Sequence, residues 1–112
     1  MDTKELKRWI IIHNVRQRTM DGFWLCFENY RREEPEEYEL YFHDFSKNQL
    51  TLNMCQVALK IKAWDNFEEE YNANLEYIEA YLDLRYNDVY IGYYSLLFHF
   101  SGETFDDYFV LE

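Results

Sequence analysis

The alternation of side chains along the last third of the chain constrains its fold more than any other feature. Residues 78–85 place an apolar side chain at every second position, the period of a strand with one buried face. Residues 89–100 and 105–111 are rich in Tyr, Phe, Ile and Leu, and short turn-forming segments at 87–88 and 101–103 separate them. Three consecutive strands joined by short turns predict an antiparallel meander.

Further strands are predicted in the first half of the chain. Residues 1–7 are polar, which predicts a frayed end or a short turn, and residues 31–37 form a charged segment with the single Pro35, which predicts a loop. Asp21-Gly22 is a hairpin-type dipeptide between two segments rich in β-branched and aromatic residues. The strands predicted on this basis are residues 9–15, 23–30 and 38–45.

The middle of the chain carries one more strand and one helix signal. After a turn at 46–48, residues 50–54 and 57–61 alternate, and Cys55-Gln56 breaks the register as a β-bulge would. A helix over 54–64 is the alternative. Asp65 to Glu68 has the spacing of a capping box, and Phe67, Tyr71 and Leu75 fall four apart. We therefore expect a helix over 66–74.

Together these patterns predict an α+β fold with a predominantly antiparallel sheet of about six to seven strands and one short helix packed on it. The length of 112 residues fits a single domain, 1–112. With 48% hydrophobic and 21% aromatic residues, disorder is excluded. No apolar run has the roughly 20 residues of a membrane span or the form of a signal-peptide core, so we expect a cytoplasmic protein.

The net charge of −11 is distributed unevenly. Residues 1–62 hold ten acidic and ten basic side chains, whereas residues 63–112 hold twelve acidic side chains against Arg85 alone. Nucleic-acid binding draws its affinity from Lys and Arg on phosphates, so a direct nucleic-acid partner is not expected. An anionic membrane surface would also repel the chain. A cationic protein is the expected partner, and an acidic surface that only aids solubility is the alternative.

Catalytic and cofactor signals are weak. His13, His43 and His99 lie in apparent strand patterns without metal-site spacing, and no glycine-rich phosphate-binding motif occurs, so neither metal nor cofactor is expected. Cys26 and Cys55 are most simply reduced buried thiols, although a disulfide and a Cys–His nucleophile both stay open. An enzyme with a carboxylate or Cys–His site is therefore the least favoured class.

Tyrosines interleaved with acids point to an interface instead. The face of the predicted strand opposite Ile78 and Leu82 would carry tyrosines, acids and Arg85, and large rigid aromatics are common at binding surfaces. The alternative is that Tyr in strands reflects β propensity alone. The candidate partner-binding residues are Tyr77, Glu79, Tyr81, Asp83 and Asp88 in one patch, and Asp106, Asp107, Glu68, Glu69 and Glu70 in a second.

The C-terminal segments 90–94 (YIGYY) and 102–110 (GETFDDYFV) carry a resemblance. Together they resemble the C-terminal hairpin of bacterial immunity proteins from polymorphic-toxin and contact-dependent growth inhibition systems. The resemblance covers about a fifth of the chain. It implies a small, acidic, cytoplasmic α+β protein that binds and blocks one cognate toxin domain, with a basic nuclease as the expected toxin. No binding residues carry over from it.

The sequence thus favours an inhibitor whose acidic, Tyr-rich surface occludes a nuclease cleft. The alternative is a phage-type nucleic-acid mimic that blocks a host DNA-binding or defence complex. A toxin gene directly upstream would favour the first hypothesis. Exposed strand edges and surplus Tyr would also permit a weak homodimer.

Overall fold

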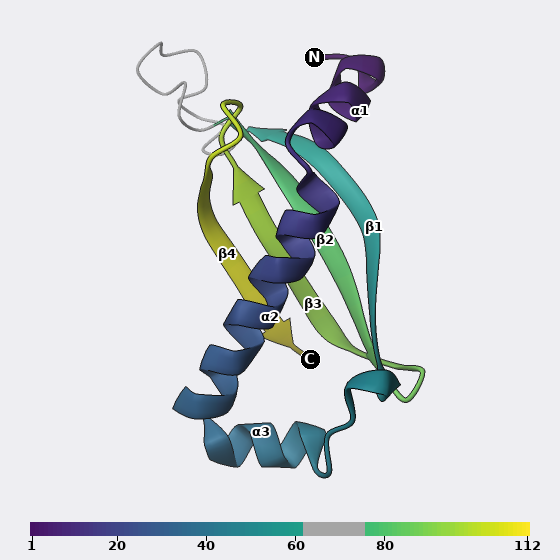
Figure 1. Ribbon diagram of the computed structural model, residues 1–112, viewed down its shortest axis with the longest axis vertical. Helices are drawn as coiled ribbons and strands as arrows, with labels where there is room; N and C mark the ends of the chain where they lie inside the picture. Colours follow the sequence, from purple (N-terminus) through teal and green to yellow (C-terminus); the bar gives the residue numbers. More distant parts are fainter. Residues whose placement is uncertain (62–75) are drawn as a thin grey trace.

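The computed structural model describes residues 1–61 and 76–112. In that part of the chain, three helices precede a four-stranded antiparallel sheet whose strands lie in the order β1-β2-β3-β4. The elements are α1 (Thr3–Ile12), α2 (Val15–Glu33), α3 (Pro35–Phe42), the 3₁₀ turn η1 (Lys47–Gln49), β1 (Leu50–Ile61), β2 (Glu76–Tyr86), β3 (Val89–Phe98) and β4 (Thr104–Leu111). Figure 1 shows α2 crossing one face of the sheet diagonally, with α1 and α3 near its two ends.

The strands predicted at 9–15 and 23–30 are wrong, because both segments are helical. The buried side chains of α2 are Val15, Thr19, Phe23 and Phe27, which recur every four residues as one helical face does. Phe23, Leu25 and Phe27 alternate along the chain as in a strand, but Leu25 is 67% exposed while Phe23 and Phe27 are buried. Asp21-Gly22 accordingly lies inside α2 and forms no hairpin turn.

The predictions for residues 1–7 and 31–45 are also wrong. Asp2 caps α1 by accepting a hydrogen bond from the Glu5 N–H at 2.8 Å, so the helix begins at Thr3. Pro35 stands in the first turn of α3, where its fixed φ and missing N–H suit a helix start. Tyr38 and Phe42 are the buried pair of α3, one helical turn apart.

The second half of the chain follows the prediction closely. β1 has its register shift between Met54 and Gln56, as expected of a bulge, and the alternative helix over this segment is not formed. Asn87 and Asp88 both have positive φ, 52° and 64°, as a tight hairpin turn requires. The meander is confirmed. The fold is α+β, with four strands and three helices among the described residues instead of six to seven strands and one helix; the helix predicted at 66–74 lies outside those residues.

The hydrophobic core lies between α2 and the sheet face beneath it. Ile78, Leu82 and Leu84 of β2 are at most 1% exposed and face the helices. Phe27 is the centre of an aromatic cluster, with rings at centroid distances of 5.2–6.4 Å. Its neighbours are Phe23, Trp24, Tyr38, Phe42, Phe45 and Phe109. None of the described helices covers the opposite face of the sheet (Figure 1).

Candidate functional site

The uncovered face of the sheet carries the first predicted patch. Tyr77, Glu79, Tyr81 and Asp83 alternate with the buried residues of β2, so they lie on the side away from α2. All four are half-buried, whereas the sequence predicted an exposed row. Asp88 lies apart from them in the exposed turn between β2 and β3. The structure therefore brings four of these five residues together.

Each acid of this face has a basic neighbour within the chain, while Asp83 Oδ1 is buried without a hydrogen-bond partner among the described residues. Lys60 of β1 forms an ion pair with Glu79, and its hydrogen bond to this carboxylate raises the pKa of Lys60. The Arg85 guanidinium lies 3.4 Å from Asp83, and the side chains of Glu79 and Asp83 are each only 15% exposed. The face consequently offers little unpaired negative charge to a partner.

Aromatic rings cover the rest of this face. Tyr81 stacks on Tyr93 of β3 at a centroid distance of 5.1 Å, and burial strongly raises the pKa of the Tyr81 hydroxyl. Tyr77 meets Phe105 of β4 edge-on at 5.8 Å. Ser95 is fully buried, and its hydroxyl has no hydrogen-bond partner among the described residues. We call this surface, formed by Tyr77, Glu79, Tyr81, Asp83 and Tyr93, the tyrosine face.

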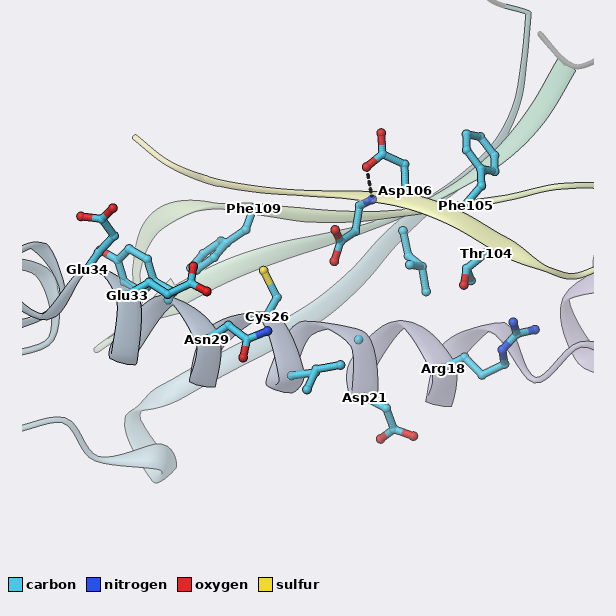
Figure 2. A pocket seen from close by; sticks show the side chains of 15 residues that line it. Arg18, Asp21, Cys26, Asn29, Glu33, Glu34, Thr104, Phe105, Asp106 and Phe109 are labelled. Atoms are coloured by element: carbon cyan, nitrogen blue, oxygen red, sulfur yellow. Dashed lines mark hydrogen bonds between the residues drawn. The ribbon is translucent and has the colours of Figure 1, made fainter.

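A second surface is a groove of ≈900 Å³ between α2 and β4 (Figure 2). Carboxylates line it from both sides, and Arg18 at one end is the only cation among the described lining residues. The Arg32 guanidinium lies beside the groove, where it donates to Oδ1 of the lining residue Asn29. Leu25 and Phe109 supply apolar surface between them. We call it the acidic groove and define it by its acidic lining residues, which are Asp21, Glu33 and Glu34 on the helix side and Asp106 and Asp107 on β4. The Asp107 carboxylate points from β4 toward α2, whereas the Asp106 carboxylate points away from α2 (Figure 2).

The floor of the acidic groove is fixed by a hydrogen bond across the sheet. The buried Tyr94 hydroxyl donates to Asp107 Oδ2 at 2.8 Å, which holds this carboxylate against β3. Burial, together with this hydrogen bond, strongly raises the pKa of Tyr94. Beside it, burial and the charges of Asp107 and Glu33 raise the pKa of the Cys26 thiol to about 11.

This raised pKa makes a nucleophilic role for Cys26 unfavourable, because the thiolate is the reactive form. The histidines lie elsewhere. His13 packs on Trp9 at the end of α1, His99 stacks on Phe105 at 4.3 Å, and His43 is exposed beside Glu39. Cys26 and Cys55 are both free, and Cys55 is exposed, contrary to the expectation of a buried thiol. In residues 1–61 and 76–112, no group of His, Cys, Asp and Glu could hold a metal ion.

The sequence located one side of the acidic groove and missed the other. Asp106 and Asp107 were predicted as binding residues, and both line it. Glu68, Glu69 and Glu70 lie outside the described residues. Glu33 and Asn29 of α2 were missed because a strand and a loop were predicted there. The signal that could have found them is the spacing of Leu25, Asn29 and Glu33, four apart along one helical stripe.

Comparisons with known proteins identify no relative. No protein-family model, no curated protein and no solved structure matches this chain. No helix in the part of the chain that the structure describes is long and apolar enough to cross a membrane.

Proposed function

We propose that this chain is a protein inhibitor that binds and neutralises a cationic toxin domain, as bacterial immunity proteins do. The observation that carries the proposal is the acidic groove, whose lining among the described residues includes five acidic residues and one basic residue, Arg18. A basic nuclease is the expected toxin, because its cleft must hold phosphates with Lys and Arg. Carboxylates can take the positions that phosphates would occupy there.

Electrostatics favours this function in two ways. The net charge of −11 attracts a cationic partner before contact, and such steering raises association rates well above those of neutral pairs. Within the groove, Glu33 and Glu34 are exposed and have no ion pair with any described cation, so they are available to a partner's Lys or Arg. The acids of the tyrosine face are already paired with Lys60 and Arg85.

The tyrosine face can add contact area in the same complex. Phe105 and Tyr108 of β4 are each 43% exposed, so an aromatic surface continues from this face toward the edge strand. Tyr rings give large contact area at low entropic cost. We propose that the acidic groove supplies charge recognition and that the tyrosine face supplies a flanking apolar contact.

The test is an affinity capture from the native lysate at moderate salt, followed by an activity assay. One stoichiometric basic protein, whose nuclease activity falls when this chain is added, is the expected result. A large DNA-handling complex would instead favour a nucleic-acid mimic. Capture of no basic protein, with the chain running as a clean monomer, would contradict the inhibitor proposal and leave the acids as a solubilising surface.

A further inference from the structure

The free edge of β4 is the feature that carries a further inference. β4 pairs with β3 on one side, and none of the described strands pairs with its other side. Its first five residues are exposed and its last three are half-buried. An unpaired edge presents backbone N–H and C=O groups that can pair with another extended segment. The acidic groove runs along this same strand (Figure 2).

The register of β4 indicates which backbone groups face outward. The Glu112 N–H donates to Ile91 O at 2.9 Å, next to the pair formed by Leu111 and Gly92. Hydrogen-bonded pairs alternate along an antiparallel ladder, so Tyr108 and Val110 also turn their backbone groups toward β3. The backbone groups of Phe109 and Leu111 therefore turn outward.

One outward group is already satisfied. The Asp107 N–H belongs to the outward set and donates to Asp106 Oδ1 at 2.8 Å. The edge is thus capped at its acidic end, while the N–H groups of Phe109 and Leu111 have no acceptor among the described residues. Charged side chains are a known protection of edges against self-association.

Charge decides which segment fits this edge. Asp107 and Phe109 have outward backbone groups, and their side chains line the acidic groove. A strand that pairs with this edge would therefore also meet the negative charge of the groove. A second copy of this chain would bring a second net charge of −11 and a second acidic groove to this edge. Like charges directly opposed across a ladder are destabilising. A cationic segment is favoured instead.

We propose that β4 takes an extended, Lys- or Arg-rich segment of the partner as a fifth strand, with alternate basic side chains in the acidic groove. Such strand addition derives affinity from main-chain hydrogen bonds and specificity from alternate side chains. The inference rests on the proposed function for the identity of the partner, and the free edge and the charge of the groove define its mode of binding.

The test uses a blocked octapeptide of alternating Lys and Val, which matches the eight residues of β4. Two N-methylated forms are compared with it, one methylated on every Lys amide and one on every Val amide. In an added strand only one set of amides faces β4. One methylated form should therefore lose more than about tenfold in affinity and the other less than about threefold, since each lost hydrogen bond contributes about 1 kcal/mol.

Amide hydrogen exchange by NMR supplies a second readout. Exchange at Phe109 and Leu111 should slow when the peptide binds, while Tyr108 and Val110, which already face β3, should change little.

A charge variant and a matched control complete the test. Glu33→Gln with Glu34→Gln should weaken binding severalfold, because it removes two groove charges. Asp106, which accepts the hydrogen bond from the Asp107 N–H, is left in place, so the cap on the edge is retained. The matched control is Glu28→Gln with Asp44→Asn, two exposed acids outside the groove.

Equal effects of the two methylation patterns, or unchanged exchange at Phe109 and Leu111, would overturn strand addition and leave simple charge attraction. That result would not affect the capture of a basic toxin, which tests the proposed function separately. Conversely, if only one of the two methylated peptides loses affinity and no basic protein is captured, the result would support strand addition and contradict the inhibitor proposal.

Discussion

The substitution Gly22→Ala tests how closely α2 packs on the sheet. Gly22 lies in the interior of α2, where an Ala normally stabilises the helix by about 1 kcal/mol. A Cβ at this position would lie 2.7 Å from the Tyr94 hydroxyl oxygen, closer than real Cβ contacts allow. The next atoms, Leu96 Cδ2 and Tyr94 Cζ, are at an ordinary 3.6 Å. The Tyr94 hydroxyl therefore explains why position 22 is occupied by Gly.

The cost can be estimated from that one contact. Tyr94 is fully buried, so its ring cannot swing aside, and moving its hydroxyl strains the 2.8 Å hydrogen bond to Asp107. Overpacking of this kind costs about 1–3 kcal/mol, and a strained hydrogen bond to a carboxylate adds to it. After the gain in helix propensity, we expect Gly22→Ala to lower the free energy of unfolding by about 1–2 kcal/mol.

Removing the hydroxyl should reverse the sign. In a Tyr94→Phe background the atom at 2.7 Å is gone, so Gly22→Ala should stabilise by about 1 kcal/mol. Urea unfolding of the four proteins, followed by circular dichroism, measures both effects and their coupling of about 2–3 kcal/mol. If Gly22→Ala has the same effect in both backgrounds, or stabilises the wild type, the inferred packing of α2 on β3 is wrong.

Three further predictions concern the core and the two surfaces. Burial and the hydrogen bond to Asp107 raise the pKa of Tyr94 above its ordinary value of 10 in the folded protein, so the neutral hydroxyl contributes its full stabilisation below pH 10 and this contribution is lost as the pH rises beyond 10. Tyr94→Phe should therefore flatten the fall of the unfolding free energy at alkaline pH, and an unchanged pH profile would contradict the buried hydrogen bond. Phe27→Ala should cost about 3–5 kcal/mol in urea unfolding, since it empties the centre of the aromatic cluster, and a loss below about 1 kcal/mol would contradict that role. Ser95→Ala should leave stability unchanged or raise it by up to about 1 kcal/mol, because no described group pairs with this buried hydroxyl, whereas a clear loss would reveal a partner for it.

The sequence predicted the sheet of this fold well because the information there is local. In β2, each apolar residue from Ile78 to Leu84 faces the core, so the period of two is uninterrupted. Asn87 and Asp88 tolerate positive φ, which marks the hairpin turn directly. The bulge in β1 was visible as a break in alternation at Cys55.

The helices could not be recognised in the same way. Phe23, Phe27, Tyr38 and Phe42 are aromatic residues with β propensity, and spacings of four satisfy both a strand and a helix. The residues that would have decided the matter, such as the exposed Leu25, are apolar themselves. Packing of α2 across the sheet, which is tertiary information, overrides the local preference of these segments.

The residues of the candidate site also differ in whether the local sequence was enough to find them. Asp106 and Asp107 were found from charge alone, but their counterparts on α2 needed the helix to be known. The reverse holds for Glu79. In the sequence, Glu79 belongs to the acidic segment 63–112, in which Arg85 is the single basic residue. In the sheet, Glu79 forms an ion pair with Lys60, which comes from residues 1–62, where acidic and basic residues are equal in number. Charge counted along a sequence thus overestimated the charge that the tyrosine face presents.

The most direct test of the central claim compares charge reversal on the two surfaces. The captured basic partner is titrated with Glu33→Lys plus Glu34→Lys in the acidic groove, and with Glu79→Lys plus Asp83→Lys on the tyrosine face, after circular dichroism has confirmed folding. We predict that the groove variant loses more than about tenfold in affinity and part of its salt dependence, with a smaller loss for the tyrosine-face variant. Unchanged affinity in the groove variant, or a larger loss on the tyrosine face, would contradict the assignment of the acidic groove as the binding site.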